Sequence, residues 1–303
     1  MAVTIIDVSP RDGLQNESAL LSTDDKLALI ARLVEAGLTS IEVTSFVNPR
    51  LVPAMADADE IMRRLPRHDT VRYIGLVLNE RGMERAIEGG VDEANIVIAA
   101  SDRFSEKNQG LSTFEGAAMA VRAARIARDA GIEPSITIST AFGCPFEGEV
   151  PLPRLVDVVN AVSEADPVRI NLGDTIGVAV PTDVHERFSA VRPLAGEAAL
   201  GAHFHNTRNT GYANAVAALA EGVTHFDASL GGIGGCPFAP NATGNVATDD
   251  LVYLFERMGV STGLDLDAVL SGSQWLEGPL GKKVPALLPK AGPFPGRPAT
   301  LGS

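Results

Sequence analysis

Two histidines in this chain have a spacing that suits metal binding. They are His203 and His205, which close a short apolar run at residues 202–206. Alternate side chains of a β-strand lie on one face, so on a strand both imidazoles point the same way. Two converging imidazoles at a strand end are suited to a divalent cation. A histidine within a strand is otherwise commonly a hydrogen-bonded core residue, and that structural role is the alternative for each.

Two further segments carry residue types that do chemistry. The pair Arg11 and Asp12 follows the first expected strand, and the thiol of Cys236 follows a glycine-rich run at residues 231–235. The run lacks the Gly-x-Gly-x-x-Gly spacing, and Cys-Pro follows it instead of a helix start, so a dinucleotide-binding loop is rejected. The glycines are typical of a hinge that moves the thiol into and out of a site, with a structural crossing loop as the alternative.

Strand-like and helix-like segments alternate along the whole chain and must position these residues. We expect strands at residues 3–8, 40–45, 72–78, 94–100, 135–141, 168–172, 200–204 and 225–229. We expect helices at residues 23–36, 53–65, 80–88, 114–130, 153–164, 181–191, 210–221 and 248–258. Such a series favours the α/β class and a (β/α)8 TIM barrel, with an open doubly wound sheet as the alternative.

The end of the chain reads as an extension of the barrel. We expect residues 1–264 to form the catalytic barrel and residues 265–303 to pack on it. The extension begins with a helix near residues 266–275 and continues as an extended, proline-rich tail. Its last ten or so residues are expected to be disordered.

A barrel of this kind would bring the reactive segments together. Chemistry in such barrels sits at the C-terminal ends of the strands, where Arg11 and Asp12 follow the first strand and His203 and His205 end the seventh. Closure makes the eighth strand, followed by Asn245, a neighbour of both. Two imidazoles, one carboxylate and one amide oxygen suit Mg²⁺ or Mn²⁺, while two histidines with a carboxylate also describe an Fe(II) facial triad.

Other polar residues are expected at the same end of the barrel. Glu42 lies on the second strand, Ser101 follows the fourth, and Asp174 follows the sixth. Carboxylates near a cation are suited to proton transfer or to orienting ligands, and pairing with a neighbouring arginine or backbone N–H is the alternative. Cys144 follows the fifth strand and is expected to be a packing residue.

Composition excludes several classes of protein. The chain has 303 residues, 45% hydrophobic content and a formal net charge of −13, which argues against non-specific nucleic-acid binding. Its two cysteines are too few for a disulfide framework or an all-cysteine zinc site. No run approaches the roughly 18–20 apolar residues of a membrane span. A strand near residue 3 leaves no room for a signal peptide, so we expect a soluble cytoplasmic protein.

Taken together, the motifs resemble the 3-hydroxy-3-methylglutaryl-CoA lyase family, among the barrel metallolyases that also include isopropylmalate-synthase-like enzymes. The likeness covers residue 3 to about residue 283. Its strongest motifs are residues 10–17, 44–47 and 172–177, the pair His203 and His205, and residues 231–237 with 244–245. The Gly-Leu-Gln-Asn-Glu run and the Gly-Gly-Cys-Pro run favour the lyase branch over the synthases.

The resemblance implies a role for each candidate site residue. Mg²⁺ or Mn²⁺ would be held by Asp12, His203, His205 and Asn245. Catalytic roles would fall to Arg11, which stabilises the enolate of the leaving acetyl-CoA, and to the loop thiol of Cys236. Supporting acid–base or orienting roles would fall to Glu42, Asp174 and His203. Substrate contacts would be made by Arg11, Gln15, Ser101 and Lys283, the last near the CoA phosphates or the mobile loop.

The resemblance also implies a substrate class. The expected partner is a 3-hydroxyacyl-CoA thioester, cleaved by a retro-Claisen (retro-aldol) path; hydroxymethylglutaryl-CoA would give acetyl-CoA and acetoacetate, as in leucine degradation and ketone-body formation. A citramalyl-CoA-type or other hydroxyacyl-CoA lyase is the first alternative. An Fe(II) oxygenase and a catalytically silent barrel are the others. A homodimer is expected only because barrels often pair.

Four residues depart from the family pattern. Thr137 stands where the lyases have a tyrosine on the fifth strand, Asn206 stands where they usually have an aspartate, and Arg208 and Asn209 replace a Tyr-Gly pair. We expect the acyl specificity to be decided at these positions.

Overall fold

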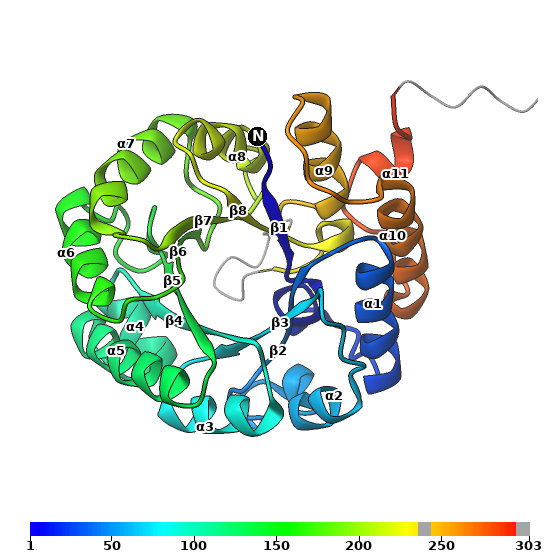
Figure 1. Ribbon diagram of the computed structural model, residues 1–303. Coiled ribbons are helices and arrows are strands. Elements are labelled where there is room, and N and C mark those ends of the chain that lie inside the picture. Colours follow the sequence, from blue (N-terminus) through cyan, green and yellow to red (C-terminus); the bar gives the residue numbers. More distant parts are fainter. Residues whose placement is uncertain (236–243, 295–303) are drawn as a thin grey trace, which may run out of the picture.

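The strands close into a parallel barrel with its helices on the outside (Figure 1). The computed structural model describes residues 1–235 and 244–294, and within them β1 pairs with both β2 and β8. The strands are β1 Thr4–Asp7, β2 Ser40–Ser45, β3 Arg72–Val77, β4 Glu93–Ala99, β5 Glu133–Ser139, β6 Arg169–Asp174, β7 Ala199–Phe204 and β8 His225–Ala228. The expected (β/α)8 TIM barrel is confirmed, and the open sheet is excluded.

The helices that follow the strands form the outer ring (Figure 1). They are α1 Thr23–Glu35, α2 Ala58–Arg64, α3 Glu80–Gly89, α5 Thr113–Asp129, α6 Leu152–Ser163, α7 Pro181–Val191, α8 Gly211–Ala220 and α9 Thr248–Arg257. Local sequence explains their starts. For α5, the side chain of Ser112 accepts from the backbone N–H of Glu115, whose carboxylate accepts from the backbone N–H of Ser112. The buried face of α5 is mostly alanine, so it lies close to β4 and β5.

Some elements differ from the sequence expectations. The segment expected as one helix at residues 53–65 is a 3₁₀ turn, Pro53–Met55, followed by α2. A helix that was not expected, α4, spans Asp102–Gln109; its sequence is too polar and short to show a clear helical period. The helix expected near residues 266–275 is longer in the structure: α10 runs from Leu266 to Leu280 and contains Pro279 one residue before its end.

The C-terminal extension packs outside the ring. In Figure 1, α10 lies beside α1 and α9, and these contacts also bring the guanidinium carbon of Arg32 to 4.1 Å from the ring centre of Trp275. A short helix, α11 Leu288–Ala291, interrupts the part expected to be extended. The expectation of a disordered end concerns residues 295–303, which lie outside the described residues. None of the described helices has the length and apolar character needed to cross a bilayer.

The interior of the barrel is divided between apolar and polar side chains. Ile6, Val8 and Ile74 form an apolar cluster separate from the larger core between barrel and helices. Strands β4, β5 and β6 instead contribute buried polar residues at alternate positions, namely Glu93, Asn95, Ser135, Thr137, Arg169 and Asn171. Of these polar residues, Asn95 and Thr137 also line the cavity described below.

Candidate active site

A cavity of about 780 Å³ opens at the C-terminal ends of the strands. Its inner part is lined by Arg11, Asp12, His203, His205 and Asp227. Sites for small molecules and cofactors occupy roughly 300–1,000 Å³, so this cavity can hold an extended ligand. Reactive side chains from β1, β7 and β8 therefore share one concave space.

A π-helical turn places the Arg-Asp pair at the cavity. It spans Ser9–Gly13 and is closed by a hydrogen bond from the backbone N–H of Gly13 to the carbonyl oxygen of Val8, with an N–O distance of 3.0 Å. Turns of this type are rare and are frequent at functional sites. The wide turn projects Arg11 and Asp12 toward the end of β7. This turn could not be predicted from the sequence, because a single widened turn has no hydrophobic period.

Backbone pairing brings Asn245 to the two histidines. The backbone N–H of Asn206 donates to the carbonyl of Gly244 at 2.9 Å, and that of Val246 donates to the carbonyl of Phe204 at 3.1 Å. The segment that follows the undescribed residues 236–243 therefore runs beside the end of β7. This pairing produces the proximity that barrel closure predicts.

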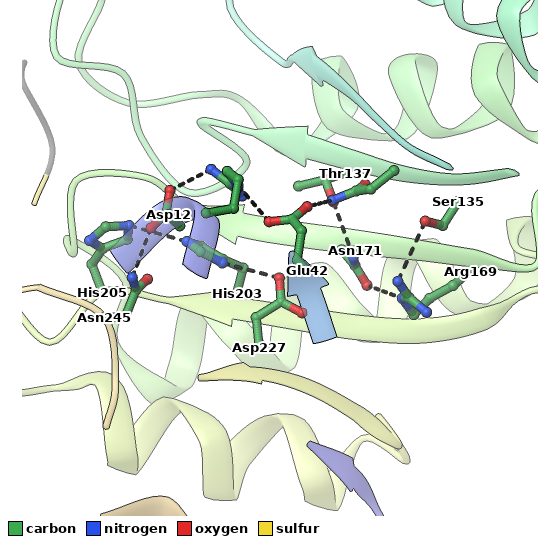
Figure 2. A network of polar contacts seen from close by, with 12 residues as sticks. Asp12, Glu42, Ser135, Thr137, Arg169, Asn171, His203, His205, Asp227 and Asn245 are labelled. Atoms are coloured by element: carbon green, nitrogen blue, oxygen red, sulfur yellow. Dashed lines mark hydrogen bonds and ion pairs between the residues drawn. The ribbon is translucent and has the colours of Figure 1, made fainter. Parts of the chain in front are cut away.

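The resulting cluster is suited to a divalent cation. One ligand atom each of Asp12, His203 and His205 lies within 4.8 Å of the others. Asn245 donates from Nδ2 to Oδ2 of Asp12 at 2.8 Å, as Figure 2 shows, so its Oδ1 is turned away from that carboxylate. This Oδ1 is buried and has no hydrogen-bond partner among the described residues. A cation would satisfy an oxygen whose burial is otherwise costly, so the residues present fit a metal.

Asp227 orients the first histidine. Its Oδ2 lies 3.1 Å from Nδ1 of His203 (Figure 2), which assigns the proton to Nδ1 and leaves Nε2 free to bind a cation. The two Nε2 atoms of His203 and His205 lie 3.1 Å apart. Burial opposes a charge on His203, but the hydrogen bond to Asp227 and the charge of Asp12 outweigh it and raise its pKa. Burial and the neighbouring His203 lower the pKa of His205 to about 4.

Arg11 lies between two carboxylates. Its Nε donates to Oε2 of Glu42 at 2.5 Å, and its Nη1 donates to Oδ1 of Asp12 at 2.6 Å. Burial alone would raise the pKa of Asp12, but the charges of Arg11 and of His203 and His205 hold it well below its usual range. The site therefore presents a charged carboxylate to a cation and a charged guanidinium beside it.

Two expected site residues have structural partners instead of cavity contacts. The carboxylate of Asp174 accepts hydrogen bonds from the backbone N–H groups of Val178 and Ala179, at 2.9 and 3.0 Å. Burial outweighs these bonds and raises the pKa of Asp174 to about 6. The hydroxyl of Ser101 lies 3.3 Å from that of Thr140. Neither Asp174 nor Ser101 lines the cavity.

The remaining expectations are placed as follows. Gln15 lines the cavity, whereas the exposed Lys283 is paired with Glu277 at 2.5 Å and does not line it. Cys144 is buried in the core, as expected for a packing residue. Cys236 lies outside the described residues.

The departures from the family pattern lie in different surroundings. Thr137 lines the cavity. Arg208 donates from Nη1 to the carbonyl oxygens of Ile176 and Gly177, at 2.8 and 2.9 Å, and so braces the loop after β6. Asn206 accepts from the first backbone N–H of α8. Of these residues, Thr137 is the one in a position to touch a ligand.

Sequence reasoning missed Asp227, Asn95 and Asn171. Each lies on a strand that was expected, at a position that alternates with apolar residues. A polar residue within a buried parallel strand is itself a signal, because such strands are otherwise apolar throughout. That signal identifies residues inside the barrel, but it does not give their partners.

Comparisons with known proteins agree with this geometry. The family model described as HMGL-like matches residues 2–275. The chain is 45% identical to (R)-citramalyl-CoA lyase of Chloroflexus aurantiacus, with 96% of this chain and 95% of that protein covered. It is 41% identical to hydroxymethylglutaryl-CoA lyase of Bacillus subtilis, covering 94% and 95%. Its structure resembles an HMG-CoA lyase from Acinetobacter baumannii in complex with coenzyme A and 3-methylmalate, with a TM-score of 0.92, 37% identity, and 97% and 96% covered.

Proposed function

Because this chain belongs to the HMGL-like family, we propose that it is a carbon–carbon lyase that cleaves a 3-hydroxyacyl-CoA with the aid of a divalent metal. The observation that carries the proposal is the cluster of Asp12, His203 and His205, with the guanidinium of Arg11 beside it. The preferred substrate is hydroxymethylglutaryl-CoA, which would place the enzyme in leucine degradation and ketone-body formation. The relative that acts on citramalyl-CoA supports that thioester as the second candidate.

The proposed cofactor is Mg²⁺ or Mn²⁺. Asp12, His203, His205 and Asn245 would hold it, the last through the unpartnered Oδ1. An oxygen-containing ligand set without thiolate suits these hard cations. A bound cation would polarise the substrate hydroxyl and lower its pKa. Asp227 would keep the imidazole of His203 in the tautomer that such binding requires.

Arg11 is proposed to stabilise the charge that develops in the reaction. Proton loss from the substrate hydroxyl to Asp12 allows the C2–C3 bond to break with its electron pair moving toward the thioester oxygen; His203, with Nδ1 protonated and Nε2 assigned to the cation, would contribute by holding the cation. Arg11 already uses Nε and Nη1 on Glu42 and Asp12, while its second terminal nitrogen has no hydrogen-bond partner among the described residues. A fixed donor at this point strengthens its interaction only as the enolate forms, which lowers the barrier.

Cys236 is proposed to complete the reaction by protonating the enolate carbon, which gives acetyl-CoA. The support for this role is the position of Cys236 after the glycine-rich run of the lyase motif. The other product is the ketone left by the broken bond: acetoacetate from hydroxymethylglutaryl-CoA, or pyruvate from citramalyl-CoA.

The outer part of the cavity supports an acyl-CoA as the substrate. It is lined by the amide side chains of Asn16, Asn48, Asn79, Asn108 and Gln109, together with Lys107. Amides and one cation suit a long polar ligand with phosphate groups. The structural neighbour bound to coenzyme A supports the same ligand class.

A cleavage assay tests the proposed function. The protein, supplied with Mg²⁺ or Mn²⁺ under anaerobic conditions, is incubated with hydroxymethylglutaryl-CoA and with citramalyl-CoA, and the products are identified by mass. We expect acetyl-CoA with acetoacetate from the first thioester. Exclusive release of acetyl-CoA and pyruvate from the second would replace the preferred substrate. Absence of cleavage across the panel with metal bound would reject a lyase in favour of a silent barrel.

A further inference from the structure

A continuous row of hydrogen bonds crosses the interior of the barrel, from Arg169 at the N-terminal end of β6 to Glu42 on β2. Figure 2 shows it running from Arg169 through Asn171 and Thr137 toward Glu42 and the metal cluster. Nε of Arg169 donates to Oδ1 of Asn171 at 3.0 Å, and Nδ2 of Asn171 donates to Oγ1 of Thr137 at 3.0 Å. Oγ1 of Thr137 donates to Oδ1 of Asn95 at 2.8 Å, and Nδ2 of Asn95 donates to Oε1 of Glu42 at 2.9 Å.

Every bond in this row points in the same direction. It starts at a guanidinium, which can only donate, and ends at a carboxylate, which accepts. The orientation of both amides and of the Thr137 hydroxyl is therefore fixed, and aligned hydrogen bonds of this kind polarise one another. The only hydroxyl hydrogen of Thr137 is used on Asn95, so Thr137 has no proton to offer a substrate.

The far end of the row is anchored by charge. Arg169 forms an ion pair with Glu93, which also accepts a hydrogen bond of 2.6 Å from Oγ of Ser135. Both charged side chains are almost completely buried. Burial of an ion pair costs free energy that can exceed the attraction between the charges, so this pair is weak evidence for a contribution to stability.

A glycine on β7 makes room for the row. Residue 201 lies against the side chain of Asn171, and a Cβ at Gly201 would overlap Oδ1 of Asn171. β7 thus has no side chain at the position where the amide of Asn171 occupies the space.

We propose that Asn95 and Thr137 are positioning residues that hold Glu42, and through Glu42 the guanidinium of Arg11, in the orientation that the reaction needs. Glu42 accepts from Asn95 with one carboxylate oxygen and from Nε of Arg11 with the other. Rotation of the carboxylate would therefore break one of the two bonds. The inference rests on the proposed function, because it concerns the same Arg11.

Thr137→Val removes the hydroxyl but keeps the shape of the side chain. We expect kcat for acyl-CoA cleavage to fall about 10- to 100-fold, as is typical for groups that orient a catalytic residue, while KM changes little. Thr137→Ser restores the hydroxyl and is expected to recover kcat to within about threefold of the wild type. The Kd for Mn²⁺, measured by titration calorimetry, is expected to stay within about threefold in both variants, because the row ends at Arg11 and not at the metal ligands.

A double-mutant cycle separates positioning from general damage to the fold. Arg11→Lys removes the planar group that the row orients, so Thr137→Val in that background is expected to lower kcat by less than about threefold further. Ser163→Ala removes a half-buried hydroxyl whose partners among the described residues are the backbone carbonyls of Val159 and Leu194, and it serves as the control for loss of a hydroxyl. Asn95→Ala is the second variant if Thr137→Val does not fold.

The outcomes distinguish this inference from the proposed function. If the wild type cleaves no acyl-CoA, the proposed function itself is rejected. If the wild type is active and both Thr137→Val and Asn95→Ala keep its kcat, the positioning role is rejected alone. A fall in kcat that is equally large in the Arg11→Lys background, or that Thr137→Ser does not recover, also overturns the proposal.

Discussion

At the scale of single residues, the site depends on the two carboxylates that hold the guanidinium of Arg11. Its guanidinium contacts Glu42 and Asp12 at the same time, so it is fixed before any ligand arrives. Burial works against this charge, but the two carboxylates outweigh burial and raise the pKa of Arg11. A donor held in place beforehand needs no reorganisation when charge develops, which is how such groups lower a barrier.

Replacement of Arg11 by methionine tests this role. We expect Arg11→Met to lower kcat by at least about 10²–10³-fold, the usual cost of losing one donor to a developing oxyanion. The Kd for Mn²⁺ is expected to change little, because the carboxylate and imidazoles of the cluster remain. Arg128→Met, which removes an exposed arginine on α5, is the matched control. Activity of Arg11→Met within tenfold of the wild type would contradict the role.

The spatial clustering of the proposed metal ligands was predictable from sequence, and the residues that support them were not. Asp12, His203, His205 and Asn245 follow strands that a closed barrel makes neighbours, so topology alone brings them together. Asp227 could not be assigned to His203 in the same way, because that pairing depends on the register between β7 and β8. Register is decided by packing across the barrel, which a single sequence does not reveal.

At the scale of elements, the segment after residue 243 has to follow a close path. Gly244 has φ +102°, and a Cβ there would overlap the carbonyl oxygens of Gly232 and Gly234. A residue with a side chain would therefore displace the backbone just before Asn245. The position of Asn245, a proposed metal ligand, thus depends on Gly244, which would not itself contact the metal.

Gly244→Ala is predicted to weaken metal binding. We expect the Kd for Mn²⁺ to rise at least about 10-fold, as is typical when the support of a ligand is lost. Gly259→Ala is a matched control, since Gly259 also has a positive φ of +75° but open space around it. Both variants place alanine at a positive φ, which costs about 1–2 kcal/mol in the left-handed region, so the control accounts for strain of this kind and lacks the overlap. Equal Mn²⁺ affinities in the two variants would show that the overlap is relieved elsewhere.

The start of α9 carries a buried acid whose charge costs stability. The carboxylate of Asp249 accepts a hydrogen bond of 2.7 Å from the backbone N–H of Gly231 and another from Ser273. Burial outweighs these bonds and raises the pKa of Asp249 to about 6, above the value of about 4 in an unfolded chain. The folded state therefore holds this proton more tightly, so the contribution to stability is greatest below pH 4 and is lost as pH rises through 6.

Asp249→Asn should reduce this pH dependence. An amide can still accept from Gly231 and carries no charge, so the variant gains stability relative to the wild type as pH rises from 4.5 to 7.5. The expected relative gain is on the order of 2 kcal/mol, from a pKa difference of about two units. Urea unfolding of both proteins at the two pH values measures it. If the stability of the variant relative to the wild type were lower at pH 7.5 than at pH 4.5, the hydrogen bonds of the carboxylate would outweigh the cost of burying its charge.

The elements themselves were largely predictable, with informative exceptions. Strands of isoleucine and valine alternate with amphipathic helices, and every expected strand is present in the described structure. The π-helical turn at Ser9–Gly13 and the polar helix α4 were not predicted. Neither has a clear apolar period, and both line or shape the cavity. Prediction from the local hydrophobic pattern fails for these two segments because tertiary contacts, and not a local apolar period, determine their conformation.

At the scale of the whole molecule, the extension is part of the barrel's stability. Val269, Leu276, Leu280 and Val284 are all buried against α1, α9 or the start of the glycine-rich run. The backbone N–H of Ala286 also donates to the carbonyl of Gly231 at 2.9 Å. We propose that residues 265–294 fold together with the barrel as one cooperative unit.

The single tryptophan, Trp275, provides a direct test of this proposal, because it lies on α10 beside Arg32 of α1. If the extension and barrel unfold together, the urea transitions followed by Trp275 fluorescence and by far-ultraviolet circular dichroism coincide. A chain ending at residue 265 would expose the core beneath four large aliphatic side chains, each worth roughly 1.5–3 kcal/mol. That loss is about as large as the entire stability of a typical domain, roughly 5–15 kcal/mol, so the shortened chain should not fold stably. Two results together would show that the extension is a separate appendage. The fluorescence transition would occur at clearly lower urea, and the shortened chain would keep the helical content of the barrel.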